Sequence, residues 1–231
     1  MDITLIVDFF PKLISYLHIT LLILVAAVAI GLVIGVVIAL IRIYKVPGLN
    51  QLALIYISFM RGTPILIQLF LIYFGLPTLL ALVHIDVSRA NPLLFVAITY
   101  GLSCGASLAE IIRGAINGIE KGQTEAAYSI GMNEKQMMVR IILPQALVIA
   151  FPNFANSVIG SLKDTSLAFT IGVMDMVGRG NTLIASSLHA LEVYITLSII
   201  YYGVVICLEK GFSLSEKKLQ RFEGSLAVDT K

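Results

Sequence analysis

Five long apolar runs, separated by shorter polar segments, dominate the pattern along this chain. They predict helical spans at about residues 14–41, 62–85, 91–112, 141–162 and 188–209. Each run is long enough, at about 1.5 Å per residue, to cross a hydrocarbon core of about 30 Å. The pattern therefore predicts an all-α membrane protein, with five transmembrane helices in a single domain covering residues 1–231.

Two segments beside these runs are less regular. The apolar stretch 49–60 is expected to lie along the membrane interface, because the polar sequence Arg61-Gly62-Thr63-Pro64 separates it from the second run. Residues 165–187, between the fourth and fifth runs, are read either as short helices at the outer leaflet or as a loop.

The composition supports the membrane assignment. Hydrophobic residues make up 58% of the 231 residues and charged residues only 13%, whereas soluble domains carry about a quarter charged residues. The net charge of +2 is too small to indicate binding to nucleic acid. Cys104 and Cys207 both fall inside apolar runs, so we interpret them as apolar packing residues without a disulfide or metal role.

A polar, helix-forming segment at residues 120–140 lies between the third and fourth runs. Thr124 is expected to cap a short helix that contains Glu125, Ala126 and Ala127, with the acidic side chain at the favourable helix N-terminus. The two alanines predict a low-relief surface that another protein can approach closely. Gly131 suits the left-handed position that ends such a helix.

A second short helix is expected to follow directly. Asn133 and Gln136 have the spacing of a capping box, and Pro144 falls near the start of the fourth run. A helix–turn–helix joined rigidly to a membrane helix can transmit a push from a soluble protein. The competing interpretation is an ordinary amphipathic linker between two spans.

Positive charge sets the expected orientation. With residues 120–140 placed in the cytoplasm, twelve Lys and Arg residues lie inside and four lie outside. The inside residues are Arg42, Lys45, Arg61, Arg113, Lys121, Lys135, Arg140, Lys210, Lys217, Lys218, Arg221 and Lys231; the outside residues are Lys12, Arg89, Lys163 and Arg179. The N-terminus is therefore expected outside and the C-terminus in the cytoplasm.

Several motifs together resemble the permease subunits of ABC importers. The segment from Glu125-Ala126-Ala127 through Gly131 to Leu143-Pro144 resembles that family's cytoplasmic coupling loop. Four further motifs resemble its polar amino-acid branch, the histidine, glutamine and cystine type: Arg61-Gly62-Thr63-Pro64 with Gln68, and residues 109–118 (AEIIRGAING), 161–167 (SLKDTSL) and 190–194 (ALEVY). The resemblance covers about residues 15 to 222 and implies the type I importer permease fold.

The resemblance also implies partners and roles. Glu125, Ala126, Ala127, Gly131, Leu143 and Pro144 would couple the chain to a pair of ABC ATP-binding subunits. An extracytoplasmic amino-acid-binding protein would deliver a polar amino acid, with cystine as the candidate, and a second permease copy, identical or related, would complete the path. ATP and Mg²⁺ would be bound by the partner ATPase, with no cofactor or metal on this chain. The location would be the bacterial plasma membrane.

Polar side chains within the apolar runs are the candidates for a substrate path, because each is costly in lipid unless it is paired or hydrated. They are Gln68, Asn153, Asn156, Ser157, Lys163, Asp164, Thr165 and Ser166. Asn153 lies three residues from Asn156 and four from Ser157, so these side chains share a helix face. Amides can serve both the carboxylate and the ammonium of an amino acid. The alternative is that they only hydrogen-bond between helices.

Two spacings suggest packing rather than transport. Gly31 and Gly35 form a G-x-x-x-G pattern in the first run, which favours close approach of another helix, within this chain or from a partner. Glu110 and Arg113 are three residues apart and are expected to form a structural ion pair beneath the coupling loop.

Other functional classes remain open at this level. The chain contains no Walker-type glycine loop, so it is not expected to be an enzyme that hydrolyses ATP itself. A secondary transporter driven by an ion gradient would need a buried acidic residue in mid-membrane, and the charge-free runs lack one. A membrane scaffold or sensor would leave the polar residues in the spans without a pore.

Overall fold

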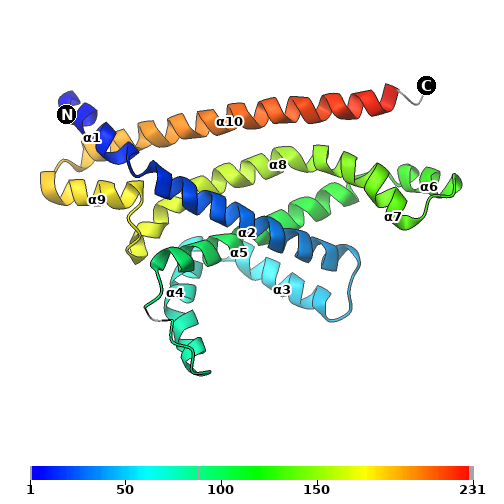
Figure 1. Ribbon diagram of the computed structural model, residues 1–231, viewed down its shortest axis with the longest axis horizontal. Coiled ribbons are helices and arrows are strands. Elements are labelled where there is room, and N and C mark those ends of the chain that lie inside the picture. Colours follow the sequence, from blue (N-terminus) through cyan, green and yellow to red (C-terminus); the bar gives the residue numbers. More distant parts are fainter. Residues whose placement is uncertain (1, 88, 229–231) are drawn as a thin grey trace.

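The computed structural model describes residues 2–87 and 89–228, which form helices joined by short turns, with no strand among them (Figure 1). In chain order the elements are α1 (Ile3–Ile14), α2 (Leu17–Ile43), α3 (Leu49–Gly62), α4 (Ile65–Ala81), α5 (Pro92–Asn117), α6 (Lys121–Ser129), α7 (Glu134–Met137), the π-helical turn η1 (Met138–Ile142), α8 (Leu143–Asp164), the 3₁₀ helix η2 (Thr165–Ile171), α9 (Met176–Ser187) and α10 (Ala190–Val228).

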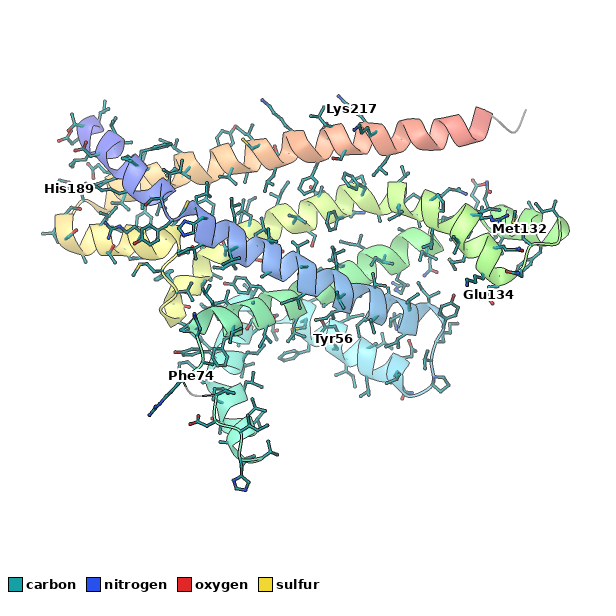
Figure 2. The ribbon with its side chains drawn as sticks, viewed as in Figure 1. Tyr56, Phe74, Met132, Glu134, His189 and Lys217 are labelled. Atoms are coloured by element: carbon teal, nitrogen blue, oxygen red, sulfur yellow. The ribbon has the colours of Figure 1, made fainter. Side chains whose placement is uncertain are left out.

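Four long helices, α2, α5, α8 and α10, run along one common direction (Figure 1). At one end of this bundle lie α1 and α9, and we call it the α9 end. At the opposite end, the α6 end, lie α6 and α7. Figure 2 shows His189 at the α9 end and Met132 and Glu134 at the α6 end.

The helices α2 and α5 pack most closely, through glycines on both. A Cβ at Gly31 of α2 would lie 2.8 Å from the Cβ of Cys104, and a Cβ at Gly101 of α5 would lie 2.5 Å from Cγ2 of Ile30. Gly35 and Gly105 continue the same seam, opposite Leu108 and Ile34. The predicted close packing at Gly31 and Gly35 is confirmed, and its partner is α5 of the same chain.

The helices α3 and α4 are bent by 114° at the Thr63-Pro64 junction. Thr63 is extended (φ −113°, ψ 143°), as expected for a residue before proline, so α3 ends there. The Gln68 side chain stabilises the bend, because its Nε2 donates to the carbonyl oxygens of Met60 (2.7 Å) and Thr63 (2.9 Å). Gln68 is 2% exposed and acts here as a cap for the end of α3.

This bend changes the expected helix bounds in residues 49–85. The expected span 62–85 is divided differently: α3 starts at Leu49 and runs back beside α2 and α5, and α4 is a separate helix of 17 residues that turns away from the bundle (Figure 1). The segment 49–60 packs on the bundle, where Tyr56 donates to the carbonyl oxygen of Leu102 (2.6 Å) in α5. Its expected place at the membrane interface stays a prediction. The polar quartet marks the junction between α3 and α4.

Four helical stretches in the described part are long and apolar enough to cross a membrane: Leu17–Ile43, Pro92–Asn117, Glu134–Ile171 and Ala190–Gln220. The bent pair α3–α4 makes a fifth if it counts as one span. The expected spans 14–41, 91–112, 141–162 and 188–209 fall on these four stretches. The last helix is longer than expected, since α10 has 39 residues.

Residues 165–187 form two short helices, η2 and α9, so this segment is not an irregular loop. Asp175 caps α9, where its Oδ1 accepts from the N–H of Gly178 (2.8 Å). Its other carboxylate oxygen, Oδ2, is buried without a hydrogen-bond partner among the described residues. Burial raises the pKa of the Asp175 carboxyl to about 6, although the hydrogen bond from Gly178 opposes the rise.

We expect Asp175→Asn to remove a loss of stability that the wild-type protein shows as the pH rises. A carboxyl with a raised folded-state pKa stabilises the fold fully below its unfolded pKa of about 4, and this contribution is lost as the pH rises through about 6. Asn is an equally good helix cap. Above that pH the free energy of unfolding of the variant should exceed that of the wild-type protein by on the order of 2 kcal/mol. In acid the two proteins should be almost equally stable. Thermal unfolding in detergent across this range checks the expectation, and a pH-independent difference would contradict it.

Candidate functional site

Two cavities lie between α5 and α8. The small cavity has a volume of about 220 Å³ and is lined by Ile65, Tyr100, Ser103, Cys104, Ser107, Ser157, Gly160, Ser161 and Asp164. The large cavity has a volume of about 700 Å³ and is lined by Arg61, Ser107, Glu110, Ile111, Gly114, Ala115, Ile149, Asn153, Asn156 and Ser157. Ser107 and Ser157 line both, so the two cavities adjoin.

Helical periodicity explains why these residues share one surface. On α5, Ser103 and Ser107 are four residues apart and Gly114 follows two turns later. On α8, Asn153, Ser157 and Ser161 repeat every four residues. Residues four apart lie on the same face of a helix, so each helix turns a stripe of small and polar side chains toward the other. The two stripes together form one surface of small and polar side chains that lines both cavities.

Tyr100 borders the small cavity and joins α5 to α8. Its hydroxyl donates to the backbone carbonyl oxygen of Asp164 (2.9 Å), the last residue of α8. Tyr100 also packs with Ala168, Ile171 and Val173 in one buried apolar cluster. The small cavity therefore adjoins a well-packed part of the core.

The candidate path residues fall into two groups. Asn153, Asn156 and Ser157 line the large cavity, and Asp164 lines the small one. The others lie elsewhere: Gln68 at the α3–α4 bend, exposed Lys163 at the last turn of α8, and Thr165 and Ser166 in η2, where their hydroxyls donate to the carbonyl oxygens of Leu162 (2.7 Å) and Lys163 (2.8 Å).

Several lining residues were missed from the sequence, namely Tyr100, Ser103, Ser107, Gly160, Ser161, Arg61 and Glu110. The available signal was the four-residue repeat of serine and glycine on α5 and α8. A search restricted to large polar side chains does not detect it, because serine and glycine are also common packing residues in membrane helices.

A cluster of charges lies around Glu110, which lines the large cavity from the C-terminal half of α5. The carboxylate of Glu110 accepts from Nε (3.1 Å) and the guanidinium Nη2 (2.6 Å) of Arg113, so the expected pair is confirmed. Nε of Arg42, from α2, lies 3.9 Å from Oε1 of the same carboxylate. Arg61, at the end of α3, interacts electrostatically with Glu110 and lines the large cavity.

The coupling-loop segment is a compact unit with its own core. Ala127 is 1% exposed and packs with Met137 and Ile142, whereas Ala126 is exposed. The expected pair of surface alanines is thus divided: only Ala126 offers a low-relief surface to a partner. Glu125 and the large apolar residue Ile130 are also exposed beside it.

The turn chemistry of this loop was largely predictable. Gly131 has a φ of 79°, and Asn133 and Gln136 form the predicted capping box, with backbone-to-side-chain distances of 3.0 and 2.9 Å. The expected cap at Thr124 is wrong, because α6 begins three residues earlier, at Lys121, and Thr124 lies inside the helix. The helix includes Gly122 despite its low helix propensity, so neither propensity nor the capping residue type locates the start of α6.

The loop joins α8 without a break in helical structure. The N–H of Leu143 bonds to the carbonyl oxygen of Met138, five residues earlier, which makes η1 a π-helical turn. Pro144 follows in the first turn of α8 and has no N–H to donate. A wider turn next to the proline accommodates the missing hydrogen bond, and π turns are often found at functional sites.

Comparisons with known proteins agree on one class. The sequence profile described as "Binding-protein-dependent transport system inner membrane component" matches residues 31–220. The chain is 55% identical over 220 residues to the L-cystine transport system permease protein TcyL of Bacillus subtilis (strain 168), covering 95% of this chain and 92% of that protein. It is 45% identical over 197 residues to the probable amino-acid permease protein YxeN of the same organism, covering 85% and 86%.

The fold is similar to that of a solved transporter. A crystal structure of an amino acid ABC transporter with histidines superimposes with a TM-score of 0.84 at 31% sequence identity, covering 94% of this chain and 99% of that one. The similarity therefore extends over nearly the whole length of both chains.

Proposed function

The chain belongs to the family of inner membrane components of binding-protein-dependent transport systems, and from that premise we propose that its small and large cavities carry the substrate. The chain is the permease subunit of an amino-acid ABC importer. We propose a polar amino acid as cargo, with cystine the first candidate because of the 55% identity to an L-cystine permease.

The observation that carries this proposal is the continuous polar surface of α5 and α8. Serine hydroxyls and asparagine amides in the two cavities provide both donors and acceptors, which a zwitterionic amino acid needs for its ammonium and carboxylate. Polar groups at membrane depth are costly unless they are paired or face water. A polar stripe shared by two helices and bordering two cavities is thus better suited to a hydrated route than to packing alone.

The proposed partners follow from the family and from exposed surfaces. A pair of ABC ATP-binding subunits, which hold ATP and Mg²⁺, docks on α6 and the residues around it: Glu125, Ala126, Gly131, Leu143 and Pro144. An extracytoplasmic binding protein delivers the amino acid at the α9 end. The α6 end then faces the cytoplasm together with the C-terminus, and the N-terminus faces outward, as the Lys and Arg distribution favours.

We also propose a second permease copy beside this one. The helix α4 projects away from the bundle (Figure 1), and its Phe74 is 64% exposed (Figure 2). A single set of about five spans provides one wall of a route, and a two-fold related copy would supply the other.

The mechanism proposed is alternating access. Binding of ATP closes the ATPase pair, and α6 passes that movement through η1 to α8, whose polar stripe lines both cavities. The coupling-loop segment moves as one body because Ala127, Met137 and Ile142 form its core. A push on the loop then shifts α8 against α5 and opens the route toward the α9 end, and hydrolysis of ATP resets it.

Ser157→Leu tests the route, since Ser157 lines both cavities. We expect ATP-driven uptake of L-cystine by proteoliposomes that contain the permease, the ATPase and the binding protein to fall roughly tenfold or more, because the larger side chain fills the junction. Ser198→Leu, the same change at an exposed site on α10, should leave uptake unchanged.

The reconstitution also tests the wider proposal. Uptake should require ATP and both partners, and a panel of labelled polar amino acids identifies the cargo. Wild-type uptake with Ser157→Leu would argue against this route, and uptake driven by an ion gradient through this chain alone would argue against the importer assignment.

A further inference from the structure

Arg61 is distinguished by its charge and position among the residues that line the two cavities. It is the one cationic side chain among them, and Glu110 and Asp164 are the two anionic ones. The large cavity thus has a guanidinium from the last turn of α3, the helix that ends at the bend before α4.

The charges around Arg61 leave its guanidinium available. Glu110, the acidic residue with which it shares the cavity, is already held by two donors of Arg113 and approached by Arg42. Within the described part of the chain, no carboxylate lies at ion-pair distance from Arg61. Three arginines therefore accompany one carboxylate here, a net charge of +2 for the cluster, which favours an additional anion.

The backbone around Arg61 is fixed. It lies in the last turn of α3, and the Gln68 side chain bonds to the carbonyl oxygens of Met60 and Thr63, on either side of it in sequence. The Thr63 hydroxyl adds a bond to the carbonyl oxygen of Phe59 (2.8 Å). A guanidinium on a fixed backbone loses less freedom on binding than one on a loop, so the site is partly preorganised.

We propose that the large cavity is a substrate site in which Arg61 binds the α-carboxylate of the transported amino acid. A guanidinium matches a carboxylate with two parallel hydrogen bonds. The amides of Asn153 and Asn156 and the hydroxyl of Ser157 serve the ammonium and the remaining carboxylate lone pairs from α8. Because the α-carboxylate is common to all amino acids, Arg61 recognises the class, and other lining residues select the side chain.

Gln68 becomes a positioning residue in this arrangement. It lines neither cavity, but it holds the backbone on both sides of Arg61. Its replacement should weaken binding of amino acids by displacing Arg61, without removing any group that touches the ligand.

This inference rests on the proposed transport function, and a binding assay tests it separately. The purified permease–ATPase complex, without the binding protein, is incubated with labelled L-cystine and with labelled L-glutamine. Unlabelled competitors are the same amino acids and their carboxamide forms, which lack the carboxylate. The variants are Arg61→Gln, Arg61→Lys and, as a matched control, Arg89→Gln at an exposed position that lines neither cavity.

The wild-type complex should bind the free amino acid better than its carboxamide. Arg61→Gln should weaken binding of the free amino acid roughly 10- to 100-fold, the effect of losing a charge-assisted pair, and leave binding of the carboxamide unchanged. Arg61→Lys should retain part of the preference, and Arg89→Gln all of it.

Two results would overturn the inference. One is wild-type affinity in Arg61→Gln. The other is an equal loss for the acid and its carboxamide in a variant that elutes as a folded complex, since this indicates a structural role. The proposed function fails in a different way: the wild-type system, with both partners and ATP, then takes up no amino acid at all.

Discussion

Replacing Ala126 with tryptophan is expected to stop ATP-driven uptake while the membrane bundle remains folded. Ala126 is the exposed alanine of α6, beside Glu125, on the surface proposed to enter a groove of the ATPase. An indole at this point would hold the two proteins apart. Losing one central contact of an interface typically costs about 2 kcal/mol or more, roughly a 30-fold weaker association. Amino-acid uptake and binding-protein-stimulated ATP hydrolysis in proteoliposomes should both fall accordingly.

Two companion variants make this result interpretable. Ala126→Ser keeps the side chain small and should retain coupling, because the defect expected for Ala126→Trp comes from the size of its side chain. Ala127→Trp should instead lower the melting temperature, since Ala127 packs against Met137 and Ile142 inside the loop. Normal uptake by Ala126→Trp would refute a docking role for this face of α6.

The contrast between Ala126 and Ala127 illustrates what the sequence alone could not supply. Both are small residues in one polar helix, and their burial depends on the phase of that helix against Met137 and Ile142. Neighbouring residues in a helix differ by about 100° in direction, so two adjacent alanines cannot both face the same partner, and packing decides which one is buried. Gly131 and the Asn133–Gln136 box act locally and are predicted correctly, whereas the expected cap at Thr124 is a separate error in the start of α6.

In the helix bundle, too, some features were predictable from the sequence and others depended on packing. Apolar length was enough to predict α2, α5, α8 and α10, because the hydrocarbon thickness sets that length. The buried face of each helix was harder to predict, because side chains that face lipid are as apolar as side chains packed inside the bundle. The α3–α4 bend depends on Gln68 reaching back to Met60, eight residues earlier, and no local pattern predicts that contact.

The candidate path was predictable in part for a related reason. Asn153, Asn156 and Ser157 share a face through their spacing, and the structure places all three on the large cavity. The opposing stripe on α5 consists of serine and glycine, whose small size serves both packing and hydration. Only the packing of α5 against α8 shows whether these small residues serve packing or hydration. The sequence alone does not reveal which helices pack together.

The seam between α2 and α5 leads to the second large prediction. A methyl group added by Gly101→Ala would meet Ile30, with Cβ distances of 2.5 Å to its Cγ2 and 2.7 Å to its Cβ. Both contacts are with atoms near the Ile30 backbone, so the two helices must separate. Overpacking of this kind costs about 1–3 kcal/mol, and in a marginally stable membrane bundle we expect a clear fall in melting temperature and in folded yield.

Gly203→Ala, the same substitution on α10, provides the matched control, since its added Cβ meets nothing within 4 Å and alanine favours helix by about 1 kcal/mol. It should therefore be neutral or slightly stabilising. Ile30→Ala should partly rescue Gly101→Ala, because it removes the nearer clashing atom, Cγ2, and leaves only the Cβ; the two changes together should therefore cost less than the sum of each alone. Additive losses in that double-mutant cycle would mean that Gly101 and Ile30 do not meet, and would disprove the glycine seam as the reason for the close crossing of α2 and α5.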